Sequence, residues 1–286
     1  AGATGGEVTL TGESVNVSGD VDASGDAGGG TIQVGGGLAG ADPTVPNAAD
    51  TTVTDTATLT ADAVTSGDGG TVVVWADDTT VFDGSISATG GAESGAGGFA
   101  EVSGKQTLYI SGHADLTSAT SEAGTLLLDP TGPTTIVDGP NAGGGAGNTI
   151  NDGWIEAQLA GGNLGITVND TGGGTWDGDL TVNSDVSVNW TGGAFGVELS
   201  FFVDRNITMG GTFAADPGEA LRLLFGLNGA LNGGGVLRLN GVTLTVPTTT
   251  ITGGPGVDTL AGSNAATVWN ITGNNSGTLT GINSFT

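Results

Sequence analysis

The chain has 286 residues and a formal net charge of −26, because 30 acidic side chains stand against only four basic ones. So few basic residues give no footprint for a phosphate backbone or an anionic membrane surface, so we expect neither nucleic acid nor membranes as partners. The chain has 58 glycines and no cysteine, which excludes a disulfide framework and thiolate metal sites. No stretch approaches the ~18 consecutive apolar residues of a membrane span, so no membrane insertion is expected.

A repeating unit occupies the first part of the chain. Residues 5–36 and 69–104 share one order: a Gly-Gly pair, two strands, a short third strand, a Gly-rich corner and the next strand. The comparable first strands begin near Val8, Ile32, Val72, Phe99 and Leu126. Three of the steps between them are 24, 27 and 27 residues, and the longer step from Ile32 to Val72 holds one rung plus an insertion at 38–50. Self-similarity at such a period is the signature of a solenoid.

Apolar and polar residues alternate within each unit. Val15 and Val17 share one parity of their strand, and Asn16 falls on the other. Period-2 alternation places the first set inward and the second outward. Strands this short cannot bury a face alone, so stacked coils must bury a continuous core. We therefore predict an all-β fold, a parallel β-helix (β-solenoid), whose inward side chains include Val73, Phe99, Leu108, Leu126 and Leu128.

A sandwich built from hairpins is the competing all-β fold. It would place Asn-Gly or Asp-Gly turns between paired strands. Such pairs do occur, as at Asp83-Gly84 and Asn240-Gly241. They lie inside a coil-length period, which favours the solenoid.

The pattern divides the chain into three segments. Residues 1–130 form a first β-helix segment, and residues 131–165 form a connector rich in glycine and proline. Residues 166–286 form a second β-helix segment with a Gly-rich, repeat-like tail.

One short helix is expected inside the connector. Asn151 or Asp152 is placed to cap a helix over Trp154–Ala160, and Gly161 follows as a stop signal. This helix would interrupt the β-helix between its two segments.

Three sequence elements within residues 69–131 point to a known family. They read V-V-W-A-D, G-G-F-x-E-V-S-G and A-G-T-L-L-L-D-P. Together they resemble a recurring block of the filamentous haemagglutinin family, which comprises large exoproteins of two-partner secretion systems in Gram-negative bacteria. The region that contains TINDGWIEAQLAGG and DLTVNSDVSVNW looks like the block that usually follows in such exoproteins.

This resemblance covers about residues 5–250 and carries structural and cellular implications. It implies a right-handed parallel β-helix, an extracellular or cell-surface location, and a role in adhesion or matrix building. It carries over no catalytic residues, because the family pattern is structural.

The tail is similar to a module repeated in very large bacterial surface adhesins. Its start fits the calcium-binding nonapeptide pattern G-G-x-G-x-D-x-U-x. Carbonyl groups of Gly254 and Gly256 and the carboxylate of Asp258 would then contribute to a Ca²⁺ site, of which a single copy supplies half. The alternative interpretation is a Gly-rich corner with a capping aspartate.

A sugar site is the other candidate. Asp177 and Asp179 fall at i and i+2 and would share a face, and Trp176 beside them could stack on a glycan. A polysaccharide-cleaving enzyme needs two carboxylates at a defined separation, and Asp77-Asp78 is a further acidic pair. The basic partners that a uronate substrate requires are scattered, however. Outward acids at solvated corners are therefore the favoured interpretation, and no catalysis is expected.

These features predict a structural rod segment of a secreted bacterial adhesin or extracellular surface filament. The alternative is a glycan-binding or polysaccharide-cleaving β-helix protein. The expected partners are further coils or copies of the same protein in a filament or tandem array, because strand pattern begins near Val8 and runs to Thr286 without polar caps. Glycans of a host or matrix are the second class of expected partner.

Overall fold

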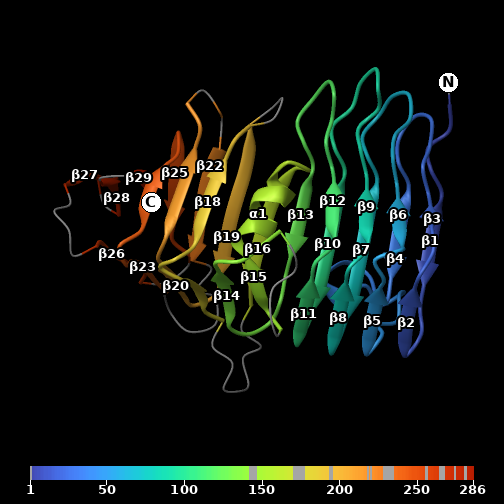
Figure 1. The fold of residues 1–286 in the computed structure, drawn as a ribbon, viewed down its shortest axis with the longest axis horizontal. Coiled ribbons are helices and arrows are strands. Elements are labelled where there is room, and N and C mark those ends of the chain that lie inside the picture. The colour runs from blue at the N-terminus through green and yellow to red at the C-terminus, as the bar shows by residue number, and fades with distance from the viewer. Residues whose placement is uncertain are drawn as a thin grey trace.

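The strands of this protein form successive coils, stacked along the long axis of the molecule (Figure 1). The structure is a computed structural model, and it describes residues 2–141, 147–169, 178–192, 196–217, 219, 221–227, 235–254, 257–263, 268–273, 275–279 and 282–286. Along most of the chain each strand pairs in parallel with the third strand after it. The fold is therefore all-β with one short α-helix, and it is the predicted parallel β-helix.

A long sheet of twelve strands runs through the whole molecule. In spatial order its strands are β1 (Glu7–Leu10), β4 (Thr31–Val34), β7 (Thr71–Ala76), β10 (Phe99–Gly104), β13 (Thr125–Leu128), β16 (Asn163–Val168), β19 (Val197–Val203), β22 (Leu221–Leu227), β25 (Thr248–Thr252), β29 (Ile282–Phe285), β28 (Ser276–Leu279) and β27 (Trp269–Gly273). The pairs from β1 to β29 are parallel, whereas β28 pairs antiparallel with both β29 and β27. The stack of parallel coils therefore ends in an antiparallel hairpin.

Four smaller sheets complete the coils. Two four-stranded sheets serve the first coils, one made of β2 (Ser14–Val17), β5 (Asp50–Val53), β8 (Thr79–Phe82) and β11 (Thr107–Ile110), the other of β3 (Val21–Asp22), β6 (Thr58–Thr60), β9 (Ser85–Ser87) and β12 (His113–Asp115). A six-stranded sheet serves the later coils and holds β15 (Thr149–Asn151), β14 (Thr134–Val137), β17 (Leu180–Val182), β20 (Asn206–Met209), β23 (Val236–Leu239) and β26 (Thr259–Ala261). A three-stranded sheet beside it holds β18 (Ser187–Trp190), β21 (Thr212–Ala215) and β24 (Thr243–Thr245).

The core is a set of columns in which inward side chains stack from coil to coil. Ile32, Val72, Ala100, Leu126 and Leu164 follow one another in register along the long sheet, and all are buried. Each inward position therefore packs on the equivalent position of the next coil, which is how short strands bury a continuous core.

The predicted core is confirmed at three of its five positions. Leu108, Leu126 and Leu128 are buried in the main cluster. The prediction that Phe99 points inward is wrong, because Ala100 takes the inward position of β10 and Phe99 pairs with Thr71. Val73 is buried on the outer face of β7 instead, since it lies in register with Glu101 on the opposite parity to Val72.

The step between β4 and β7 holds one coil with an insertion, as predicted. Ile32 is the direct neighbour of Val72, and residues 35–49 separate β4 from β5. This insertion contains a short 3₁₀ turn, η1 (Leu38–Gly40), which contacts β7 and β10 of the long sheet. It thus covers the outer face of that sheet over two coils.

The predicted short helix is confirmed as α1 (Asp152–Leu159). It begins two residues before the expected start, and Asn151 precedes it without a side-chain capping bond. The long sheet continues past this helix, because β13 pairs with β16. The division into segments at 130 and 165 stays a prediction.

The helix α1 bridges the edges of two small sheets. The fully buried amide of Gln158 donates to the carbonyl of Ala114 and accepts from its N–H, both at 2.9 Å, at the edge strand β12. On the other side, Glu156 Oε1 accepts the N–H of Asn189 on β18 at 2.5 Å. Side chains of α1 thereby take the hydrogen-bonding place of a missing strand, which leaves the buried backbone groups paired. No helix among the described residues is long and apolar enough to cross a membrane.

A column of glycines marks the corner that precedes the early strands of the long sheet. It comprises Gly30, Gly70, Gly98 and Gly124. A Cβ added to Gly98 would lie 2.2 Å from the carbonyl oxygen of Gly70, and one added to Gly124 would lie 1.8 Å from that of Gly98. None of the four has a positive φ. The Gly-Gly pairs that define the repeat are therefore required by close approach of one coil to the next.

The substitution Gly98→Ala tests this explanation. We expect it to lower the free energy of unfolding by roughly 1–3 kcal/mol, the usual cost of overpacking, because the new methyl group would displace the Gly70 carbonyl. Gly6→Ala is the matched control, since a Cβ there meets no atom within 4 Å. Equal denaturation midpoints for the two variants would contradict the close-approach explanation.

Candidate functional site

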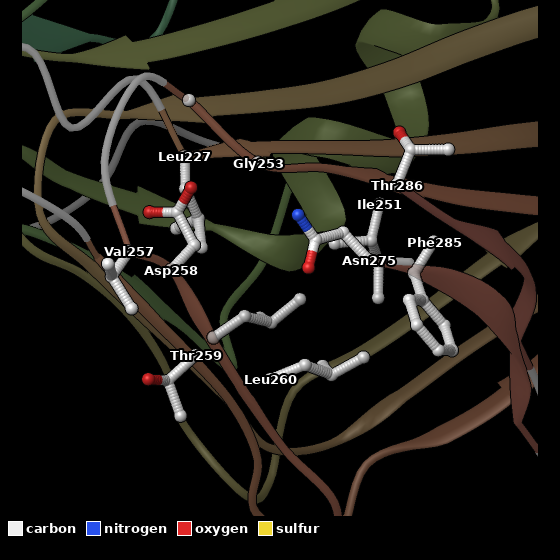
Figure 2. A pocket seen from close by; sticks show the side chains of 12 residues that line it. Leu227, Ile251, Gly253, Val257, Asp258, Thr259, Leu260, Asn275, Phe285 and Thr286 are labelled. Atoms are coloured by element: carbon white, nitrogen blue, oxygen red, sulfur yellow. The ribbon is translucent and has the colours of Figure 1, made fainter. Parts of the chain in front are cut away.

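A cavity of about 380 Å³ opens at the C-terminal end of the solenoid, at the corner where β25 leads into β26 (Figure 2). Apolar side chains from five strands form part of its wall: Leu227, Leu237, Ile251, Leu260 and Phe285. Its other lining residues are Gly253, Gly254, Val257, Asp258, Thr259, Asn275 and Thr286. The cavity is thus an apolar space with a few polar groups, the general make-up of a small-ligand pocket.

Asp258 is the only acidic side chain among the described residues that line this cavity, and its position matches a capping role. Its Oδ1 accepts the N–H of Gly235 at 2.7 Å, across the corner of the preceding coil. A Cβ on Gly253 would lie 2.7 Å from Oδ2, so the carboxylate packs closely against that glycine. Asp258 therefore ties two corners together.

The predicted calcium site lacks a full ligand set among the residues the structure describes. Asp258 and Gly254 both line the cavity, but Gly256 lies outside the described residues. Calcium requires six to eight oxygen ligands. No cluster of three or more His, Cys, Asp or Glu side chains suited to a metal ion occurs in the described part of the chain. The calcium assignment stays a prediction.

The predicted sugar-contact residues are only partly described. Trp176 and Asp177 lie outside the described residues. Asp179 precedes β17, and its Oδ1 accepts both the backbone N–H of Asn206 at 3.0 Å and its amide Nδ2 at 2.9 Å. Asp179 therefore links its coil to the next one.

A second, polar cavity of about 280 Å³ lies on the outer side of the long sheet. Trp75, Asp77, Lys105 and Asp129 line it together with Ala39, Gly40, Asn47, Thr131 and Asn169. Trp75, Asp77 and Asp129 belong to two of the three motifs that carry the family resemblance. Because Ser103 lies in register with Trp75 and its Oγ accepts the N–H of Asp129 at 3.1 Å, stacking brings these motifs to one face. The motifs by themselves did not predict that they meet on one face.

Glu101 lies beneath the insertion and anchors it. Its side chain is fully buried, and its Oε2 accepts the N–H of Ala39 at 2.9 Å. Burial raises the pKa of Glu101, and the hydrogen bonds from the Ala39 N–H and the Ser103 hydroxyl partly offset that rise. Its carboxyl group therefore fixes the loop from inside and is closed to solvent.

The indole of Trp75 forms the floor on which the insertion rests. Gly40, which has a φ of +59°, is so close that an added Cβ would lie 2.4 Å from Cε2 of that ring. Asn47 Nδ2 donates to the Gly40 carbonyl at 2.9 Å and to Asp77 Oδ1 at 3.2 Å. The loop is thus fastened at both of its ends to the outer face of the sheet.

Asp129 is the most strongly perturbed acid of the described residues. Burial, followed by the nearby negative charges of Glu101 and Asp204, raises its pKa to about 7 from 3.8. Asn169 Nδ2 donates to its Oδ1 at 2.5 Å. Asp77 and Asp129, the two acids that line this cavity, invite comparison with a glycosidase pair, but Asp77 accepts a hydrogen bond from Asn47 and Asp129 accepts one from Asn169. The acids Glu101 and Asp77 hold the insertion against the outer face of the long sheet.

The free energy of unfolding should depend on pH through the ionisation of Asp129. Because the folded-state pKa exceeds the unfolded value, stability falls as the pH rises from about 4 to about 7, by at most about 4 kcal/mol. Asp129→Asn keeps the acceptor for Asn169 but cannot ionise, so its melting temperature should fall less than that of the parent between pH 4 and pH 8. Asp20→Asn, at an exposed acid, should retain the parent's dependence. Identical pH profiles for all three proteins would refute the assignment.

No protein-family model matches this sequence, and no curated protein matches it. The assignment of a function therefore rests on the fold, the net charge and the sequence motifs of this chain.

Proposed function

We propose that this chain is a structural rod segment of a secreted bacterial adhesin or extracellular surface filament, without catalytic activity. The observation that carries the proposal is the unbroken parallel pairing of the long sheet from β1 to β29. Each coil is hydrogen-bonded to its neighbours along this sheet, so the ends of the stack are held apart by a stiff backbone ladder.

Charge supports the same function. A net charge of −26 on a chain of this size makes copies repel one another along their sides. A rod at a cell surface benefits from this, because it stays extended and does not bundle. The resemblance of residues 69–131 to the filamentous haemagglutinin family supports the extracellular location and the adhesin class. Further coils or copies of the same protein are the proposed partners, and glycans are the second class.

The alternative, a glycan-active β-helix, has less support. Among the described residues that line the cavity beside Trp75, Asp77 accepts a hydrogen bond from Asn47 and Asp129 accepts one from Asn169. Asp179 is engaged by Asn206.

The rod proposal is tested by the distance between its two ends. Thr9 on β1 and Thr250 on β25 are separated by eight register steps of the long sheet, which at ~4.8 Å each gives roughly 38 Å. Since the chain has no cysteine, Thr9→Cys with Thr250→Cys can be spin-labelled without background. We expect pulsed electron resonance to give a narrow distance distribution near this value. A distribution spread over tens of ångströms would overturn the stiff-rod proposal.

Catalysis is tested separately with neutral and acidic polysaccharides. We expect no release of new reducing ends above the buffer blank. Release that is lost in Asp129→Asn, while that variant keeps its melting temperature, would overturn the non-catalytic assignment and favour the glycan-active alternative.

A further inference from the structure

The C-terminal end of this acidic chain is almost free of charge. Asp258 is the only charged residue in the last 48 positions, whereas the preceding residues hold the other 29 acidic and all four basic side chains. The first coil, by contrast, carries several acids, including Glu7 on the edge strand β1. Another copy therefore meets little electrostatic repulsion at the surface that residues 239–286 form.

The strand β27 forms the outer edge of the long sheet at this neutral end (Figure 1). No strand among the described residues pairs with its far side. All five of its residues are exposed, with Trp269 at 40% and Ile271 at 64% of full exposure. Natural proteins protect such edges with charges or proline, and β27 has neither. An apolar, uncharged edge of this kind is a template for another strand.

The local pairing favours an additional strand in the antiparallel orientation. The sheet has already changed from parallel to antiparallel at β29, and β27 pairs antiparallel with β28. Trp269, Asn270 and Ile271 keep a regular register with β28, and the irregularity lies between Ile271 and Gly273. Trp269 is held on the inner side by an edge-to-face contact with Phe285, with ring centroids 6.0 Å apart. Residues 269–271 of β27 are thus held in a regular strand conformation that another strand can pair with.

We propose that two copies of this chain join through β27, strand against strand, about a two-fold axis at Ile271. In this arrangement each Ile271 faces its counterpart. Such a contact is isologous and closes after two copies. It joins two copies through an uncharged strand and keeps the acids of their first coils apart.

A head-to-tail contact is less favourable on the same evidence. It would place β27 of one copy against β1 of the next and remove water from the acids of the first coil, including Glu7, without supplying basic partners. Two neutral strands that meet carry no such penalty. The inference deepens the proposed rod function and rests on it, because it names the partner and the end of the rod that binds it.

A single engineered cysteine tests the two-fold directly. In an antiparallel pair, residues opposite each other have Cα atoms about 4.5–5.5 Å apart, within the range of a disulfide. Since the chain has no cysteine of its own, Ile271→Cys under mild oxidation should give a covalent dimer on a non-reducing gel. Val64→Cys, at a side chain of similar exposure, measures random collision and should stay monomeric. A mixture of Val8→Cys and Ile271→Cys proteins that cross-link to each other would overturn the two-fold in favour of head-to-tail pairing.

Sedimentation equilibrium tests the association without any cross-link. The parent should show a concentration-dependent dimer, and Ile271→Lys, which sets two like charges opposite each other, should weaken it at least tenfold. Val64→Lys should dimerise as the parent does. Unchanged circular dichroism and melting temperature show that each variant is folded. A parent that is monomeric at every concentration, while the 38 Å end-to-end distance holds, would overturn the pairing and leave the rod proposal intact. A broad distribution of the end-to-end distance would instead refute the rod proposal, whatever the gel shows.

Discussion

The hydrogen-bonded step between parallel strands of successive coils is the constraint on which the rest of this structure depends. Strands in a ladder lie ~4.8 Å apart, so each coil must follow the path of the one before it. A position that is inward in one coil must be inward in the next, which produces columns such as Ile32, Val72, Ala100 and Leu126. The same step brings corners so close that Gly70 and Gly98 leave no space for a side chain. Composition, period and core packing thus share one physical cause.

Departures from the repeating path are possible only where side chains replace the missing backbone partners. At α1, the buried amide of Gln158 pairs with both backbone groups of Ala114, and Glu156 accepts from β18. At the insertion, Glu101 accepts the N–H of Ala39, and Asn47 links the loop to Asp77. Buried backbone groups must find partners, so both departures are secured by amides and carboxylates. The raised pKa of Asp129 is a side effect of gathering acids in such a place.

The proposed function follows from this construction without a conventional active site. A stack whose coils each hold their neighbours is stiff along its axis, and an acidic surface keeps such stacks apart. The strand β27 presents an exposed edge without charged residues at the C-terminal hairpin, where the ladder has changed from parallel to antiparallel. The apolar cavity at the same end is bounded by that hairpin, since Asn275 lies in the turn between β27 and β28. Sides that repel and an edge that can pair are consistent with two copies joined at that edge.

The sequence by itself determined the fold class, the period, the insertion at 38–50 and the short helix, because alternation and glycine spacing are local signals that stacking repeats from coil to coil. It placed Leu126 and Leu128 correctly but not Phe99, because a one-residue error in register reverses the two faces of a strand. Only the tertiary structure decided that Glu101, Trp75 and Asp129 share one face, since their meeting depends on the register of three coils and on a loop folded back over them. One local signal was available: the run of apolar residues at both parities in residues 72–76 indicates a strand covered on both faces. The antiparallel end strand was not predictable in the same way, because the direction of pairing depends on where the chain turns back, and side-chain alternation is the same for either direction.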